Sequence, residues 1–272
     1  MKKILLAFDG AHFSEGALEF IRLLQSSSPV FVTGAFLPEV NYANAWSYAA
    51  GSGGLFIPLI EEEDVELVTA NIKRFETFCS NNDISYTVHK DFEDFALPEL
   101  KKETRYADLL ILGSETFYEN MGKEELNLYL RDALHATECP VLVVPEKFEL
   151  PASNILAFDA SASSVYAMKQ FAYLLPELAT NETILVNAEE GDGKLPDEEY
   201  ISEWAAKHFP NLTLSRLGAD SRKYFSAWLN ERKAAILVSG AFGRSEISTL
   251  FKKSFVSDTI KAHHIPVFIA HR

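Results

Sequence analysis

The run Leu5-Leu6-Ala7-Phe8-Asp9 (LLAFD) returns 150 positions later as Ile155-Leu156-Ala157-Phe158-Asp159 (ILAFD). In each run, four apolar residues are followed at once by an aspartate, which is typical of a buried strand that ends at a polar loop. A serine stands five residues after each aspartate, as Ser14 and Ser164. The pattern indicates the first strand of two similar units.

Two further blocks repeat in the same order. Residues 107–113 (ADLLILG) resemble 234–240 (AAILVSG), and residues 140–144 (PVLVV) resemble 266–270 (PVFIA). Chance rarely places three matching blocks in one order, so we interpret the chain as a tandem duplication.

The domain boundaries follow from these blocks. We predict a first domain over 1–145, a short proline-bracketed linker over 146–152 and a second domain over 153–272. The first copy contains extra residues, which we assign to Pro38 to Pro58, a stretch without a period of 2 or 3.6. Such an insertion is either a lid over a site or a packing arm against the other copy, and its aromatic residues favour the arm.

Short apolar runs alternate with longer helical patterns in both copies, which is typical of βαβ units. We therefore expect two tandem doubly wound α/β domains, each with a five-stranded parallel sheet flanked by helices. The expected strands of the first copy lie near 3–8, 29–36, 84–89, 108–112 and 140–144. Those of the second lie near 153–158, 182–187, 211–216, 235–239 and 265–270.

Composition narrows the function classes. The 272 residues carry a formal net charge of -14 and have a pI near 5.0, and no basic stripe interrupts the acidic pattern. We expect no nucleic-acid partner. The cysteines, Cys79 and Cys139, have neither disulfide-scaffold nor metal-ligand spacing, which favours a reducing cytoplasm. Because no apolar run is long enough to span a bilayer, we expect no membrane association.

Ligands of open parallel sheets bind beyond the carboxyl ends of the strands. The strand-ending residues Asp9 and Asp159, and Gly113 and Gly240, fall at those ends. In the second copy, Gly243 and Ser254 follow Gly240. Glycines allow backbone N–H groups to approach phosphate oxygens, and a helix start adds its dipole. This part of the second copy is therefore a candidate anion site.

The LLAFD opening, the apolar strand that ends in glycine and the closing PVLVV strand resemble the universal stress protein domain, over nearly the whole chain and twice. The resemblance implies a fold like that of the adenine nucleotide alpha hydrolases, with strand order 3-2-1-4-5. Nucleotide-binding members of the family show a glycine, two residues, a glycine, nine residues, then glycine and serine or threonine. Gly240, Gly243 and Ser254 match this motif, and Lys253 replaces its third glycine.

The resemblance also implies roles for single residues. In the family the first-strand aspartate approaches the adenine and ribose, and a second-strand residue contacts the base, which carries over to Asp159 and Val186. An ammonium group at Lys253 could pair with a phosphate. The first copy lacks the second glycine, and Glu115 and Glu119 would repel phosphate. The alternative interpretations are an Asx-type cap for Asp159 and a tight turn for the glycines.

The other candidate residues give weaker evidence for a function. His263 and His264 are adjacent and share no helix face, so we expect no metal there. His12 and His89 lie at strand mouths, where we expect solvated loop histidines, and the acidic runs 61–64 and 91–94 are expected to be solvated helix starts. No nucleophile elbow, Walker loop or dinucleotide fingerprint occurs, so we expect no catalytic site.

Three functions follow, in decreasing order of preference. The first is a stress-response regulatory protein whose second domain binds ATP or another adenine nucleotide and holds no metal of its own. The second is an interaction or scaffold protein that binds no nucleotide and acts through its surface. The third is an ATP-hydrolysing enzyme. The family resemblance implies that the two domains pair within the chain through their fifth strands, and it leaves a homodimer open.

Overall fold

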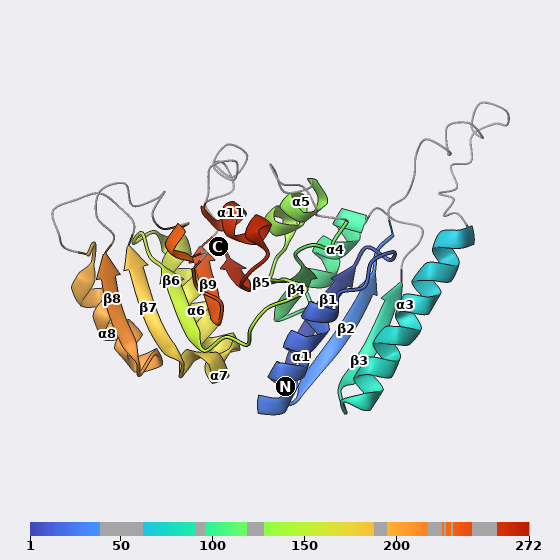
Figure 1. Cartoon of the computed structure of the whole chain (residues 1–272), viewed down its shortest axis with the longest axis horizontal. Coiled ribbons are helices and arrows are strands. Elements are labelled where there is room, and N and C mark those ends of the chain that lie inside the picture. The colour runs from blue at the N-terminus through green and yellow to red at the C-terminus, as the bar shows by residue number, and fades with distance from the viewer. Residues whose placement is uncertain are drawn as a thin grey trace. The chain divides into compact units, whose positions relative to one another are not determined.

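The computed structural model describes residues 1–38, 62–90, 96–118, 128–187, 195–216, 225, 227–229, 231–240 and 255–271. These residues fall into two compact units, which divide between Cys139 and Pro140 (Figure 1). The predicted linker, 146–152, contains neither helix nor strand. Of the predicted insertion, only Pro38 lies within the described residues.

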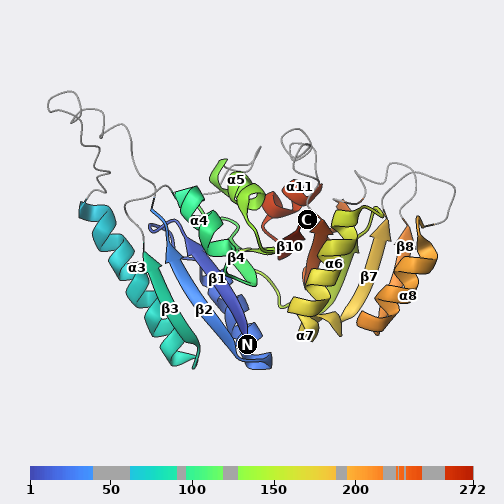
Figure 2. The same ribbon diagram turned by 180° about the vertical axis from the view of Figure 1, so that it is seen from behind.

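The first unit contains four parallel strands in the order β3-β2-β1-β4. The strands are β1 (Lys2–Phe8), β2 (Val30–Phe36), β3 (Ser85–Lys90) and β4 (Leu109–Gly113). The helices are α1 (Glu15–Ser27), α3 (Glu62–Asn81), α4 (Ala96–Thr104) and α5 (Leu128–Ala136). Helix α1 lies on the face of this sheet seen in Figure 1, and α4 lies on the face seen in Figure 2. Because both faces are covered, β4 is buried throughout its length.

The second unit contains β5 (Val141–Val144), β6 (Ser153–Ala157), β7 (Glu182–Asn187), β8 (Leu212–Arg216), β9 (Ala235–Gly240) and β10 (Val267–Ala270). Its helices are α6 (Ala162–Leu174), α7 (Pro176–Ala179), α8 (Glu198–His208) and α11 (Phe255–Ala262). The five strands β8-β7-β6-β9-β10 are parallel and reproduce the predicted order 3-2-1-4-5. The predicted α/β fold class is confirmed.

The strand expected near 140–144, the fifth of the first domain, is β5, and it pairs with β10, the fifth strand of the second repeat. This strand comes from the first sequence repeat, but it belongs to the second unit and pairs antiparallel with β10. Partner residues are Val143 with Val267, Leu142 with Phe268 and Val141 with Ile269. Backbone hydrogen bonds decide this pairing, and they are available to any edge strand regardless of its repeat of origin.

The cores consist of the predicted apolar runs. The residues from Ile4 to Phe8 are buried, as are Ile155, Leu156 and the stretch from Ala235 to Val238. Strands β3 and β8, which lie at the outer edges of their sheets, are only partly buried. The arrangement brings the carboxyl ends of β1, β2 and β4 together in the first unit, and those of β6, β7 and β9 in the second.

Candidate functional site

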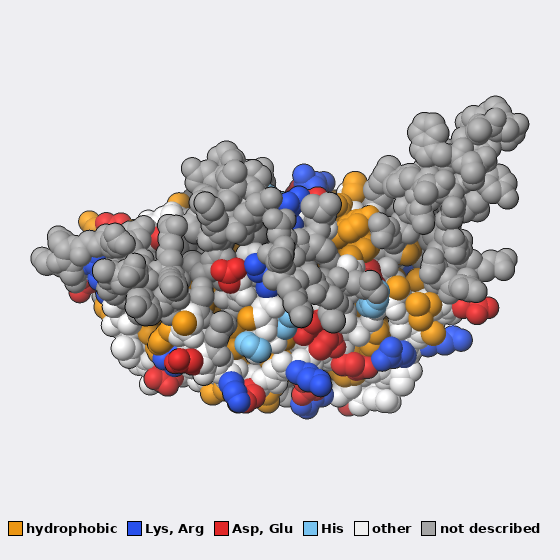
Figure 3. All heavy atoms as spheres, turned by 45° about the horizontal axis from the view of Figure 1, so that its top comes forward, with side chains coloured by type: hydrophobic (Ala, Val, Ile, Leu, Met, Phe, Trp, Pro, Cys, Tyr) orange, Lys and Arg blue, Asp and Glu red, His pale blue; other side chains and the backbone are white. Residues whose placement is uncertain are grey.

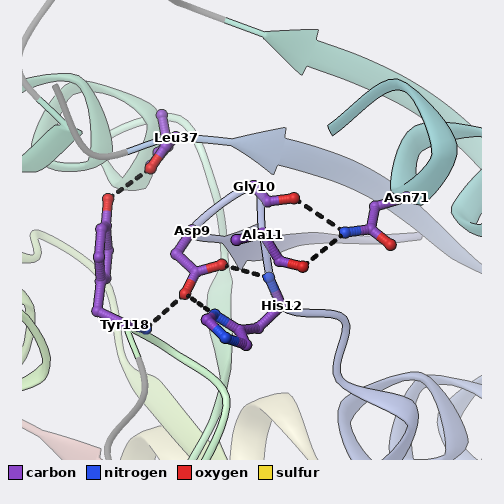
Figure 4. Close-up of polar contacts among 7 residues, drawn as sticks. All are labelled: Asp9, Gly10, Ala11, His12, Leu37, Asn71 and Tyr118. Atoms are coloured by element: carbon purple, nitrogen blue, oxygen red, sulfur yellow. Dashed lines mark hydrogen bonds and ion pairs between the residues drawn. The ribbon is translucent and has the colours of Figure 1, made fainter. Parts of the chain in front are cut away.

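In the first unit, the strand-ending aspartate is occupied by its own chain. The side chain of Asp9 directly follows β1 and is 5% exposed. The backbone N–H of His12 donates to Asp9 Oδ1 over 2.7 Å, and His12 Nδ1 lies 2.7 Å from Asp9 Oδ2. The backbone N–H of Tyr118 donates to the same Oδ2 over 2.8 Å (Figure 4). Both oxygens of Asp9 are therefore engaged.

Tyr118 also connects to the second strand. Its hydroxyl donates a hydrogen bond of 2.5 Å to the carbonyl oxygen of Leu37, just beyond β2 (Figure 4). Its ring stacks on Tyr129, with 4.0 Å between ring centroids, and its backbone takes a left-handed φ of 53°. One residue thus bridges the carboxyl ends of β1 and β2 from beyond β4. A side chain of the protein fills the part of this edge where a ligand would be expected.

The loop after Asp9 is held from the other side by α3. The Asn71 side chain is buried, and its Nδ2 donates to the carbonyl oxygens of Gly10 and Ala11 over 2.9 and 3.0 Å. Gly10 has a φ of +89°, and a Cβ there would lie 2.9 Å from Val68. Only glycine fits this position without strain.

Burial decides the electrostatics of Asp9. Removal from water raises the pKa of its carboxyl above 3.8, and hydrogen bonds from His12 and Tyr118 counteract the rise only in part. Hydrogen-bond donors therefore stabilise the ionised carboxylate of Asp9, whereas burial destabilises it. This is the environment of a structural carboxylate with fixed partners.

In the second unit, the equivalent aspartate is less engaged. Asp159 is partly exposed, and its Oδ1 accepts one hydrogen bond of 2.9 Å, from the backbone N–H of Ser161. Within the described residues this carboxylate has no other hydrogen bond or ion pair. The bond has the Asx form that the alternative interpretation expected. The actual N-cap of α6 is Ser161, whose side chain accepts from Ser164 N over 3.1 Å.

Gly240 lies against the first turn of α6. A Cβ at this position would lie 2.4 Å from Ser163 C and 2.5 Å from Ser164 N, so no side chain fits between β9 and the helix. Gly113 holds the matching place beneath α1, where a Cβ would meet side-chain atoms of Thr116 and Ser14. Close packing, against the backbone of α6 for Gly240 and against Thr116 and the N-cap Ser14 for Gly113, therefore accounts for both glycines without a ligand.

Val186 lies inside the second sheet. Its side chain is buried, and its carbonyl oxygen accepts from the backbone N–H of Phe158 over 2.9 Å. The next residue, Asn187, is also buried, and its Nδ2 donates to Phe158 O over 2.9 Å. Of the six predicted binding residues, Asp159 and Gly240 both border the start of α6. Gly243, Lys253 and Ser254 lie outside the described residues.

The sequence did not predict two residues that contact Asp9 at the carboxyl ends of the strands of the first unit. His12 is paired with Asp9, where a solvated loop histidine was expected, and Tyr118 drew no attention because it belongs to no motif. The only sequence signal was the spacing Asp9-x-x-His12, which permits a local bond. The contact between Asp9 and Tyr118 spans 109 positions and has no local signal.

The remaining candidate residues, His89 and the two cysteines, form no further site among the described residues. His89, expected to be solvated, contacts Glu103, with 2.5 Å between Nδ1 and Oε1. In the described part of the chain, no three His, Cys, Asp or Glu side chains gather to hold a metal ion. Burial raises the pKa of both Cys79 and Cys139 to about 12, which keeps the thiols protonated.

The surface shows mixed charge on the face in Figure 3, where Lys and Arg side chains are interspersed with Asp and Glu among the described residues. Among the described residues on that face, no basic stripe is visible. Among the helices that the structure describes, none has both the length and the apolar composition needed to cross a membrane.

Comparison with known proteins places this architecture. No protein-family model and no curated protein matches the sequence. A universal stress protein from Archaeoglobus fulgidus DSM 4304 is similar in structure, with a TM-score of 0.75 and 17% identity over 99% of this chain and 98% of the other. A Pseudomonas aeruginosa UCBPP-PA14 protein with a provisional universal stress protein name has a TM-score of 0.55 and 12% identity, over 100% of this chain and 93% of its own. The chain therefore has the fold of the universal stress proteins.

Proposed function

We propose that this chain is a stress-response regulatory protein of the universal stress type, and that its second unit binds an adenine nucleotide such as ATP. The observation that carries the proposal is the contrast between the two strand-ending aspartates. Asp9 is buried and engaged at both oxygens, whereas Asp159 is partly exposed and has one described hydrogen bond. The second carboxylate is therefore the more accessible acceptor for a ligand, because Asp9 is buried among its own partners.

In this proposal, one group of residues in the second unit binds the adenosine part of the nucleotide and another group binds its phosphates. Asp159 would accept from a ribose hydroxyl or an adenine amino group. The Val186 side chain is buried and its carbonyl oxygen accepts from Phe158, so a contact with the base would use the second lone pair of that oxygen. Gly240, Gly243 and Ser254 would receive the phosphates, with the Lys253 ammonium as a counter-charge.

The first unit does not fit the same ligand. Tyr118 bridges the ends of β1 and β2, and its backbone and hydroxyl take up Asp9 and Leu37. A nucleotide would have to displace a stacked aromatic side chain and two hydrogen bonds. We therefore propose one nucleotide site per chain, in a regulatory protein without a catalytic site of its own, in the cytoplasm.

The pairing of β5 with β10 supports an intramolecular association of the two repeats. A strand of the first repeat covers the edge that β10 would otherwise present, which removes a surface for edge-to-edge aggregation. Further partners of the protein, including a second copy of the chain, belong to the same proposal as surface interactions.

A second candidate is an interaction or scaffold protein that binds no nucleotide. It is favoured by a specific observation: packing against α6 explains Gly240, and the Asx hydrogen bond to Ser161 explains Asp159, without any ligand. On this interpretation Asp159 and Gly240 only join β6 and β9 to the start of α6.

Calorimetric titration with ATP and Mg²⁺ separates the two candidates, after the purified protein is checked for bound nucleotide. We expect saturable binding near one site per chain. A Gly243→Glu variant, which places a carboxylate at the phosphate position, should abolish binding. The matched variant Thr116→Glu, at the corresponding position of the first unit, should leave it unchanged.

Absence of binding heat, together with no nucleotide released on denaturation, would contradict the nucleotide proposal and favour the scaffold. Equal loss in Thr116→Glu would place the site in the first unit, against the contrast between Asp9 and Asp159.

A further inference from the structure

Helix α8 carries a row of aromatic side chains on the surface of the second unit. Tyr200, Trp204 and His208 are spaced four positions apart, so they follow one side of the helix. Ile201 and Ala205, on the adjoining side, are buried and anchor the helix to the unit. Tyr200 is 78% exposed, and Trp204 and His208 are partly exposed. We call Tyr200, Trp204 and His208 the aromatic stripe.

The stripe is held in place by neighbouring rings. The Trp204 ring contacts the His208 ring, with 4.6 Å between centroids, and the buried Phe209 ring, with 6.1 Å. Tyr173 of α6, which is 58% exposed, packs edge-on against His208 with 5.4 Å between centroids. Rings fixed in this way lose little conformational entropy when a partner covers them, which favours association.

The charges of α8 are separated along its length. Glu198 and Glu199 lie in the first turn, whereas Lys207 lies in the last. Glu203 and Lys207 are exposed and stand four positions apart, so they share one flank of the stripe. A parallel copy of this helix would set like charges side by side. An antiparallel copy sets the acidic end against the basic end and also opposes the two helix dipoles.

A two-fold axis through Trp204 satisfies the stripe and the charges together. It sets residues equally far before and after Trp204 level with each other, so Tyr200 faces the partner's His208. The axis also keeps each flank on its own side. The partner's Lys207 falls level with residue 201, about 3 Å along the helix from Glu203 at 1.5 Å per residue. Each Glu203 can therefore pair with the partner's Lys207.

We infer that the α8 face of the second unit binds a second copy of this chain, in an isologous antiparallel pair centred on Trp204. The contact gives a surface to the second copy that the proposed function leaves among its further partners, and it requires no nucleotide. Helix α8 has 11 residues and spans about 16 Å. Because its face is smaller than a standard interface of about 1,600 Å², the dimer is weak and reversible.

Sedimentation equilibrium of the full-length protein measures this association, at concentrations up to about 1 mM, the weak end of specific binding. Salt at about 0.15 M shortens the range of the repulsion between chains of net charge -14. We expect a monomer–dimer equilibrium. Tyr200→Ala should weaken the dimer at least about tenfold, the effect of an interface aromatic. Tyr106→Ala, which removes a tyrosine of the first unit that is 67% exposed, should leave it unchanged.

Charge exchange tests the antiparallel register. Glu203→Lys and Lys207→Glu should each weaken the homodimer about tenfold, because two opposite-charge pairs become two like-charge pairs. An equal mixture of these two variants should dimerise as strongly as the original chain, since one copy then carries two acids and the other two bases. Glu66→Lys, which makes the same charge change at an exposed position of α3, should leave the dimer unchanged. Circular dichroism verifies that each variant is folded.

A chain that stays monomeric up to this concentration would overturn the inference. So would a dimer that Tyr200→Ala leaves intact, or that Tyr106→Ala weakens equally, because another surface would then hold it. A mixture that associates no more strongly than either charge variant alone would overturn the antiparallel pairing. ATP titration of Tyr200→Ala should match that of the original chain, so failure of the dimer and failure of the nucleotide site are separate results.

Discussion

At the scale of the residue, Asp9 and Asp159 occupy equivalent sequence positions in different environments. Asp9 directly follows β1, Asp159 stands two positions after the end of β6, and each accepts a backbone hydrogen bond from the next loop. Asp9 additionally contacts the His12 ring and Tyr118 N and is buried. The difference arises from His12, in the loop after β1, and from Tyr118, which approaches from beyond β4.

The pKa of Asp9 gives a direct test at this scale. We expect a carboxyl ¹³C titration to show a midpoint above 3.8, because burial outweighs the donors around it. A His12→Ala variant should raise the midpoint further, since it removes a hydrogen bond and a nearby positive charge that favour the carboxylate. His89→Ala, which alters a histidine that contacts Glu103 instead, should leave it unchanged.

The same shift sets the direction of the pH effect on stability. Because the folded pKa of Asp9 exceeds the unfolded one, the folded state binds the proton more tightly. The contribution of Asp9 to the free energy of unfolding therefore falls as pH rises from the ordinary Asp range through the raised pKa. A midpoint at or below 3.8 would contradict the assignment of burial as the dominant cause.

At the scale of the element, the helix after each first strand packs directly on the end of the fourth. Helix α6 meets β9 at Gly240, and α1 meets β4 at Gly113, each beside the serine-capped start of the helix. The atoms that a Cβ would meet differ. They belong to the backbone of Ser163 and Ser164 in the second unit, and to the side chains of Thr116 and Ser14 in the first.

Alanine at each glycine tests this contact. We expect Gly240→Ala to lower the free energy of unfolding by about 1–3 kcal/mol, the usual range for overpacking, because the backbone of α6 must move. Gly113→Ala should have the smaller effect, since the Thr116 and Ser14 hydroxyls can rotate away and only the Cβ of Ser14, at 2.9 Å, must shift with its backbone. Urea denaturation of both variants provides the measurement. A larger loss of unfolding free energy in Gly113→Ala would contradict this expectation, because it would show that the side chains around Gly113 yield less easily than the backbone of α6.

At the scale of the whole molecule, β5 links the two repeats in sequence and structure. It lies at the end of the first repeat and completes the second unit, with all four of its residues buried. The parallel order β8-β7-β6-β9-β10 would otherwise end at β10, an apolar edge strand. Covering such an edge with a strand of the same chain is a common protection against aggregation.

Fragments of the chain test the contribution of β5. A fragment over 140–272 retains β5, whereas a fragment over 146–272 retains the linker without it. We expect the shorter fragment to be less stable by at least about 3 kcal/mol, because it exposes β10 and loses several buried valine and leucine side chains. A third fragment over 153–272 controls for the linker. Equal urea midpoints for all three would show that β5 is dispensable to the second unit.

The amino-acid sequence by itself determined the strands, their type and the fold class. Apolar runs closed by Asp9, Asp159, Gly113 and Gly240 have a local signal, because burial on both faces of a parallel sheet requires continuous apolar residues. It also identified the two strand-ending aspartates and glycines as the residues at the mouths of the sheets.

Only the tertiary structure decided which mouth is filled and to which compact unit β5 belongs. The bond from Tyr118 to Asp9 joins residues far apart in the chain, and its donor is a backbone N–H that every residue except proline carries. The ladder between β5 and β10 likewise consists of backbone groups. Contacts made by the backbone leave no side-chain pattern in the sequence, so they become visible only when the folded chain brings their partners together.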